Sequence, residues 1–167
     1  TGGSETRFLE ENWFLSHEPI VLALGTQSVD KGTLHLVAAM RRLWAQGSDA
    51  RLVLVGETMR EVTEAVRALP EAERARLHLL GKVSDETKRD ALAACALLAL
   101  PSRSDSFGIV LLEAWLNQKP VVGARAGGLP AVIEEARDGL LAPFGDVEAL
   151  AAAIERLLND GATRAAF

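Results

Sequence analysis

Two acids and one lysine stand where they could act on a phosphorylated or hydroxylated ligand. Asp105 and Glu113 are separated by seven residues in SRSDSFGIVLLEAW, and Lys31 directly precedes Gly32 in GTQSVDKG. At a helix start, an ammonium group can meet a phosphate while glycine lets backbone amides approach the same anion. A plain alternative for Lys31 is a solvated lysine beside a turn. GTQSVDKG contains neither the GxGxxG of dinucleotide binders nor the GxxxxGK(S/T) of nucleoside triphosphatases, which argues against both classes.

Glu113 interrupts an otherwise apolar run. The sequence on both sides, IVLL and AWL, predicts a helix that is apolar nearly all round and buried on most faces. An ionised carboxylate in such a place costs several kcal/mol unless partners satisfy it. We expect either the hydroxyl groups of a ligand, a salt bridge to an arginine, or one exposed position on an otherwise buried helix.

The residues after Asp105 predict a helix that starts directly behind a strand. The free N–H groups of its first turn and the positive end of its dipole favour an anion. Asp105 itself has a simpler interpretation as the cap of this helix. The later loop ARAGGLP contains Gly127 and Gly128, where backbone can come close to a ligand, although two glycines alone indicate only a turn.

These candidates have to be positioned by regular elements. Short apolar runs without polar alternation predict strands that are covered on both faces, at Ile20–Leu24, Leu52–Val55, Leu77–Leu80, Leu97–Leu100, Val121–Val122 and Leu140–Ala142. Apolar residues recur at helical spacing between them, and a last helix follows Asp146 as N-cap and stops at Gly161. The alternation predicts an α/β fold, a doubly wound Rossmann-like parallel sheet of about six strands with helices on both faces. Ligands bind at the carboxyl ends of such strands.

Composition excludes several classes of function. A net charge of −5, with basic residues scattered among acids, argues against a nucleic-acid partner. The longest apolar run, ALAACALLAL, is too short for a transmembrane segment. The single Cys95 rules out a disulfide framework and fits a reducing, cytoplasmic compartment. His17, His35 and His78 show no spacing of a catalytic triad or metal site, so core or surface roles are expected.

Residues 1–18 begin with TGGS and show no sustained period, which predicts a linker or interdomain segment anchored by Phe8, Trp13 and Phe14. Residues 19–167 form the predicted domain. Because the chain begins without Met, we expect it to be a piece of a longer protein.

The ordered motifs resemble those of the retaining group 1 (family four) glycosyltransferases with the GT-B fold. The pair formed by Asp105 and Glu113 around Phe-Gly is similar to the E-x7-E motif of that family, and LGTQSVDKG to its G-R-x-KG loop. ARLVLVG, LHLLGKVSD, PSRSDSFGIVLLEAWLNQKPVVGARAGGLPAVI and GLLAPFGDVEALAAAIERLL resemble its second strand, base-side loop, donor-site block and closing segment. The resemblance covers nearly the whole chain from Ile20 onward.

The resemblance implies that residues 19–167 are the nucleotide-sugar-binding, C-terminal half of a two-domain enzyme. Its partners would be a UDP-, GDP- or ADP-linked sugar and its own missing N-terminal acceptor domain. Lys31 would neutralise the diphosphate, Asp105 would hold hydroxyls of the donor sugar, and Glu113 would accept hydrogen bonds from the ribose. Transfer would retain the anomeric configuration, with no cofactor and no bound metal, and the isolated chain would bind nucleotide without turnover.

Further donor-site positions follow from the same resemblance. Lys82 and Val83 would lie beside the base, and the amides of the helix start would cradle the diphosphate. The complete set beyond the three residues above is Gly25, Thr26, Lys82, Val83, Arg103, Ser106, Phe107, Gly108, Ile109, Val110, Gly127 and Gly128.

Two positions depart from the pattern of the family. Thr26 stands where the family usually places an arginine that pairs with the lysine on the diphosphate. Loss of this cation should slow transfer, unless Arg103, Arg125 or a residue elsewhere replaces it. Asp105 is one methylene shorter than glutamate. These departures leave open a non-catalytic nucleotide-sugar-binding module, and a nucleotide-sugar epimerase domain is a further alternative. A nicotinamide oxidoreductase is disfavoured because the glycine fingerprint is absent.

Overall fold

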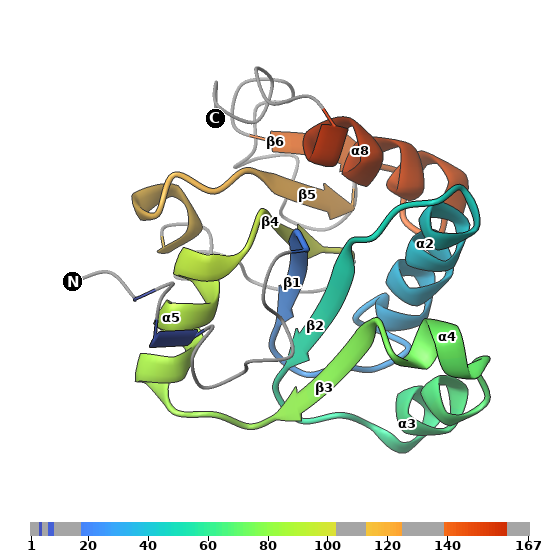
Figure 1. Cartoon of the computed structure of the whole chain (residues 1–167), viewed down its shortest axis with the longest axis horizontal. Helices are drawn as coiled ribbons and strands as arrows, with labels where there is room; N and C mark the ends of the chain where they lie inside the picture. Colours follow the sequence, from blue (N-terminus) through green and yellow to red (C-terminus); the bar gives the residue numbers. More distant parts are fainter. Residues whose placement is uncertain (1–3, 5–6, 9–17, 103–112, 125–138, 160–167) are drawn as a thin grey trace.

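The computed structural model describes residues 4, 7–8, 18–102, 113–124 and 139–159. In these residues, six parallel strands form one sheet with helices on both faces (Figure 1). The strand order is β3-β2-β1-β4-β5-β6. The strands are β1 (Ile20–Leu24), β2 (Arg51–Val55), β3 (Leu77–Gly81), β4 (Leu97–Leu100), β5 (Val121–Ala124) and β6 (Gly139–Ala142). The predicted Rossmann-like fold is therefore confirmed, and each predicted strand is found with ends shifted by two residues or fewer.

Two helical layers cover the sheet. On one face, α2 (Thr33–Ala45), α3 (Arg60–Arg67) and α8 (Val147–Asn159) pack in the larger apolar cluster, and the short α4 (Glu71–Arg74) follows α3. On the other face, α5 (Asp85–Ala94) packs in the second cluster together with Ala114, which belongs to a helical turn at residues 113–116.

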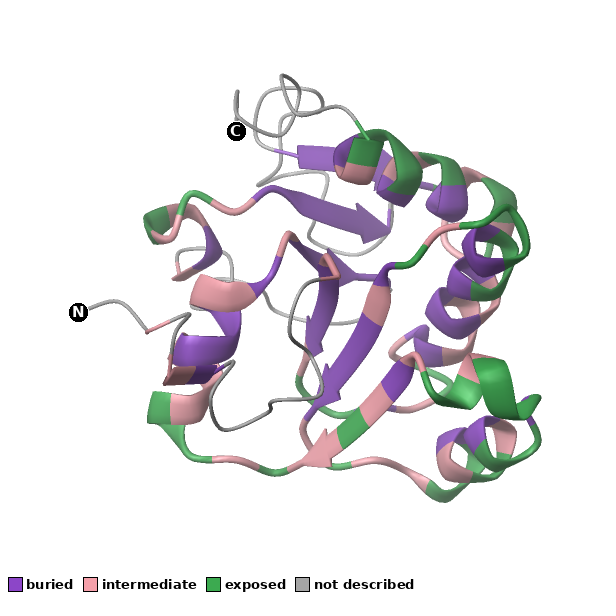
Figure 2. Cartoon of the chain, viewed as in Figure 1, coloured by how far each residue is buried: buried purple, intermediate pink, exposed green. Residues whose placement is uncertain are grey.

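The strands lack polar alternation because their two faces enter two different apolar clusters. In β1, Val21 and Ala23 pack in the cluster with α2, whereas Ile20 and Leu22 pack in the cluster with α5. Burial of each large aliphatic side chain contributes about 1.5–3 kcal/mol to folding. Figure 2 shows the inner strands as buried, while β3 at the edge is partly exposed.

Local signals set the starts of two helices. Oδ1 of Asp146 accepts a hydrogen bond from the backbone N–H of Ala149 at 2.9 Å, which confirms the predicted N-cap of α8. Oγ of Ser84 accepts one from the N–H of Thr87 at 3.1 Å and caps α5. The predicted stop at Gly161 lies outside the described residues.

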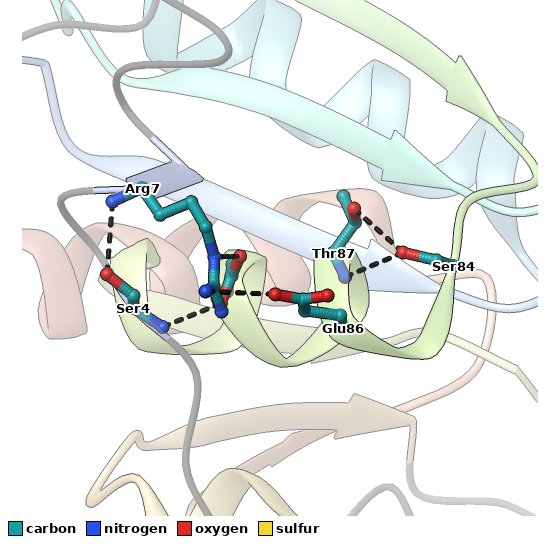
Figure 3. A network of polar contacts seen from close by, with 6 residues as sticks. Ser4, Arg7, Ser84, Glu86 and Thr87 are labelled. Atoms are coloured by element: carbon teal, nitrogen blue, oxygen red, sulfur yellow. Dashed lines mark hydrogen bonds and ion pairs between the residues drawn. The ribbon is translucent and has the colours of Figure 1, made fainter.

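The described residues near the N-terminus pack on α5 (Figure 3). Asp90 of α5, with 1% of its surface exposed, accepts hydrogen bonds from the N–H of Ser4 at 2.7 Å and from the guanidinium of Arg7. Arg7 also forms an ion pair with Glu86 at 2.9 Å, and Phe8 is fully buried in the cluster with α5. The hydrogen bond from Arg7 lowers the pKa of Asp90. Part of the predicted linker is thus attached to the domain.

Candidate functional site

The strand order reverses between β1 and β4, which pair in the middle of the sheet although they are far apart in sequence. The chain leaves β1 toward β2 on one side and leaves β4 toward β5 on the other. In a parallel sheet, the loops diverge at such a switch point and open a crevice at the carboxyl ends of the strands. In this chain, the loops that follow Leu24 and Leu100 flank that switch point.

A small, open hollow lies there. Thr26, Gln27 and Lys31 line it from the loop after β1, and Pro101 and Ser102 line it from the chain after β4. The strand-end residues Ala23, Leu24, Ala99 and Leu100 complete the lining. The lining therefore combines a lysine and two hydroxyl-bearing residues with apolar strand ends, a composition suited to an anionic, hydroxyl-bearing ligand.

The loop that carries Lys31 is attached to its neighbours by backbone contacts. The N–H of Gly25 donates to the carbonyl of Val55 at 2.9 Å, and the N–H of Gln27 donates to the carbonyl of Glu57 at 2.8 Å. Gly56 has φ of 125°, and a Cβ atom there would stand 2.0 Å from the carbonyl oxygen of Gly25. This close approach requires glycine, so the loops after β1 and β2 form one connected rim.

Several predicted site residues are brought together at this rim. Gly25 and Thr26 are exposed and Lys31 is half-buried, and the latter two line the hollow. Ser102, which is 3% exposed, and Gln27, which is also 3% exposed, were not among the predicted site residues. Their positions in the loops that follow two predicted strands are a usable signal, but residue type alone does not indicate that a glutamine is buried.

Lys82 and Val83 lie at the same edge of the sheet but not in this hollow. They follow β3, which is separated from β1 by β2. Lys82 is exposed, and Val83 is half-buried against the cluster with α5. The N–H of Gly56 donates to the carbonyl of Gly81 at 2.8 Å and connects this turn to the rim. Their predicted place beside a base stays a prediction.

The apolar run predicts that Glu113 lies in a helix buried on most faces, but the described turn at residues 113–116 is only partly buried. Ala114 is buried, but Leu116 is 83% exposed and Glu113 is half-buried. The helical turn ends directly afterwards, where the N–H and Nδ2 of Asn117 donate to the carbonyl of Glu113 at 3.2 and 2.8 Å. The last turn has only one side against the sheet, so solvent reaches the other side. Burial alone therefore does not demand a ligand for Glu113, and its role stays a prediction.

The remaining predicted site residues lie outside the described residues. The structure describes the residues on either side of them: Ser102 after β4, Ala124 at the carboxyl end of β5, and the turn that begins at Glu113. The two undescribed stretches thus follow two strands at the carboxyl edge. The residues concerned are Arg103, Asp105, Ser106, Phe107, Gly108, Ile109, Val110, Gly127 and Gly128.

A second, smaller hollow lies at the carboxyl ends of β5 and β6. His35 of α2 and Phe144 line it, with ring centroids 4.9 Å apart in an edge-to-face contact, and Pro101 belongs to both hollows. Nδ1 of His35 is buried and accepts or donates no hydrogen bond within the described part of the chain. The packing of the ring against Phe144 agrees with the predicted structural role.

The other titratable candidates have structural environments. His78 lies on β3 with Nε2 at 3.2 Å from Nη1 of Arg51, and burial, followed by the charge of Arg51, lowers its pKa to about 4. Cys95 is buried, and burial raises the pKa of its thiol to about 12, which makes it a core residue as predicted.

No cluster of three or more His, Cys, Asp or Glu suited to a metal ion occurs among the described residues. None of the helices in the described ranges is long and apolar enough to cross a membrane.

The strand order and the cation-bearing rim at the switch point define a doubly wound α/β domain with a ligand crevice at its carboxyl edge. Residues 18–160 match the family of group 1 glycosyl transferases. The chain therefore belongs to the group 1 glycosyltransferases, and its sheet is the Rossmann-like sheet of the GT-B fold.

Relatives of known activity and structure agree with this membership. Alpha-D-kanosaminyltransferase of Streptomyces kanamyceticus is 31% identical over 156 residues, which cover 91% of this chain and 39% of that protein. The crystal structure of Anabaena HepE in complex with UDP-glucose is 27% identical, with a TM-score of 0.83 over 99% of this chain and 46% of the other. The chain thus spans about two-fifths of the length of its first curated relative.

A third likeness concerns the fold alone. The C-terminal domain of a group 1 glycosyl transferase from Francisella tularensis has 18% identity and a TM-score of 0.82, with 97% of this chain and 86% of that chain covered.

Proposed function

We propose that this chain is the donor-binding domain of a retaining glycosyltransferase and binds a nucleotide-diphosphate sugar. The observation that carries the proposal is the hollow at the switch point between β1 and β4, where Lys31 and Thr26 stand above the strand ends. The crystal structures of the related HepE contain UDP and UDP-glucose, which supports a ligand of the same class here.

In the proposed complex, Lys31 contacts the diphosphate. Transfer of the sugar leaves extra negative charge on the departing diphosphate, and a cation held beside it stabilises that charge more in the transition state than in the ground state. Lys31 is half-buried at the rim, so its charge is less screened than that of a fully exposed lysine. The amides of Gly108, Ile109 and Val110 would complete the diphosphate site.

The remaining roles are assigned as the family resemblance implies. Glu113 accepts hydrogen bonds from the ribose hydroxyls, and Asp105 holds hydroxyls of the donor sugar. Lys82 and Val83 lie beside the base. The acceptor and part of the catalytic apparatus come from a second domain, so the 167-residue chain binds nucleotide without transferring sugar. No metal is required, because Lys31 and backbone amides supply the positive charge.

Calorimetric titration of the chain with UDP, GDP and ADP tests the proposal. We expect binding of at least one of the three, and a loss of about tenfold or more in affinity for Lys31→Ala, since a charge-assisted contact contributes about 1.5–3 kcal/mol. Lys88→Ala is the matched control, because Lys88 lies on α5 and pairs with Asp85 at 3.8 Å. Failure of all three nucleotides to bind would exclude a donor site.

Thr26 supports a second candidate, a nucleotide-sugar-binding module without turnover. Thr26 is exposed and lines the hollow, where the family has an arginine. With one cation fewer on the leaving group, transfer slows more than binding weakens. Assay of the complete protein decides between the candidates: hydrolysis or transfer of the donor supports the enzyme, whereas tight binding without product supports the module.

A further inference from the structure

Gln27 is a buried polar residue in the loop that carries Lys31. It has 3% of its surface exposed and lines the same hollow as Lys31. A glutamine side chain presents two N–H donors and one carbonyl acceptor, and these groups must be hydrogen-bonded when they are removed from water. The partners of Gln27 therefore show which parts of the structure this side chain connects.

The amide nitrogen of Gln27 faces the ends of two strands. Nε2 donates to the carbonyl oxygen of Gly25 at 3.0 Å and lies 3.4 Å from that of Val55 and 3.5 Å from that of Ala23. Ala23 belongs to β1 and Val55 ends β2. This half of the side chain is thus attached to the rigid carboxyl edge of the sheet.

The amide oxygen of Gln27 begins a series of hydrogen bonds that reaches Lys31. Oε1 accepts from the hydroxyl of Thr33 at 3.0 Å, and Thr33 is 1% exposed. Oγ1 of Thr33 accepts from the N–H of Ser28 at 3.1 Å, and Oγ of Ser28 accepts from the N–H of Lys31 at 3.3 Å. The backbone of Lys31 is therefore linked to the strand ends through three side chains.

We propose that Gln27 is a positioning residue, which holds the loop that carries Lys31 in place beside the hollow. The inference rests on the proposed function, in which Lys31 contacts the diphosphate. A loop that is already ordered loses little conformational entropy when the ligand binds, so the affinity for the diphosphate is higher. Gln27 itself, tied to Thr33 and to the carbonyls, is not required to touch the diphosphate.

Gln27→Met tests this role, because methionine fills a similar volume but cannot make the hydrogen bonds. Affinities are measured for UDP, GDP, ADP and the three corresponding monophosphates. We expect the affinity for the diphosphate to fall about tenfold while that for the monophosphate changes less than about twofold. Equal losses for diphosphate and monophosphate would indicate a merely structural residue. Thr63→Val is the control, since the Thr63 hydroxyl only approaches the carbonyl of Met59 at 3.4 Å.

A double-mutant cycle with Lys31→Met separates action through Lys31 from an independent effect. In the Lys31→Met background, Gln27→Met should cause no further loss of diphosphate affinity, and additive losses would overturn the proposal. Should Gln27→Met fail to fold, Thr33→Val removes the same series of hydrogen bonds and should reproduce the selective loss, and Thr33→Ser should restore the wild-type preference for diphosphate.

The two proposals can fail separately. If the wild-type chain binds none of the three diphosphates, the donor site is excluded and the role of Gln27 with it. If Lys31→Met weakens binding but neither Gln27→Met nor Thr33→Val does, the donor site stands and only the positioning role of Gln27 is wrong.

Discussion

Gly32 lies directly against Pro101: a Cβ atom added to Gly32 would stand 2.3 Å from the carbonyl oxygen of Pro101. Gly32 follows Lys31, and Pro101 precedes Ser102, so this contact holds together the two loops that line the switch-point hollow. The residue also has φ of 75°, which L-residues with a side chain rarely adopt. Two independent constraints, conformation and space, therefore require glycine beside the candidate phosphate-binding lysine.

Gly32→Ala should destabilise the domain and weaken nucleotide binding together. We expect a loss of about 1–3 kcal/mol in the free energy of unfolding from the strained conformation, and more from the collision with Pro101. Denaturant unfolding measures the first effect and titration the second. Gly47→Ala is the control, because Gly47 has φ of 97° but nothing within 4 Å of its added Cβ. Equal destabilisation by the two variants would show that the contact with Pro101 has no energetic weight.

Thr26→Arg should restore the second cation that the family places at the diphosphate. Thr26 is exposed at the hollow, so an arginine fits without repacking. We expect diphosphate affinity to rise about tenfold, since charge-assisted hydrogen bonds contribute about 1.5–3 kcal/mol, and the gain should shrink as salt is added. Val29→Arg is the control, because Val29 is 50% exposed on the same loop but does not line the hollow. A similar gain in both variants would mean only general attraction of an anion.

Glu113→Gln should weaken the binding of ribonucleotides selectively. A neutral amide is a weaker acceptor for the ribose hydroxyls than a carboxylate, so affinity should fall about tenfold or less. The affinity for the 2′,3′-dideoxynucleoside diphosphate should stay unchanged, because that ligand lacks both hydroxyls. Glu148→Gln, on the surface of α8, serves as control. If both ligands lose affinity alike, Glu113 does not bind the ribose.

Asp90→Asn should destabilise the domain at neutral pH but little in acid. The folded-state pKa of Asp90 is lowered, chiefly by the hydrogen bond from Arg7, so its carboxylate stabilises the fold above its ordinary pKa of 3.8. That contribution is lost as the pH falls through the lower folded-state pKa. We expect a difference of about 1–3 kcal/mol in unfolding free energy at pH 7, because the variant weakens the pairing of a buried acid.

Urea unfolding of wild type and Asp90→Asn at a series of pH values from neutral to strongly acidic measures this difference. The exposed acid of the same helix offers the matched variant Asp85→Asn, which should show little difference at any pH. A gap between wild type and Asp90→Asn that persists unchanged in strong acid would contradict an ionic origin.

The alternation of buried strands and helices could be predicted because each signal is local. β1 reads IVLAL, and its successive residues enter the apolar clusters on opposite faces, so a continuous apolar run marks it. The cap at Asp146 likewise depends on residues only three apart. The edge strand β3 also reads as an apolar run, but its Leu79 is 36% exposed. An apolar residue type does not show which neighbours pack against it, so the sequence could not predict this exposure.

Site residues that act through distant partners could not be predicted. The burial of Gln27 depends on carbonyls of β1 and β2, those of Ala23 and Val55. In the same way, the buried structural residue Asp90 depends on Arg7, which lies 83 residues away. Conversely, the apolar run predicts that Leu116 is buried, but it is exposed at the last residue of its helical turn. Such contacts depend on which elements become neighbours.

The sequence by itself determined the α/β class, the strand and helix segments and the loop with Lys31, since hydrophobic period, caps and glycine positions act over a few residues. Only the tertiary structure decided that β1 lies beside β4, that Gly32 rests on Pro101, and that Gln27 links the strand ends to Lys31. The physical reason is that pairing and close packing join groups remote along the chain, and their geometry exists only after the sheet has formed.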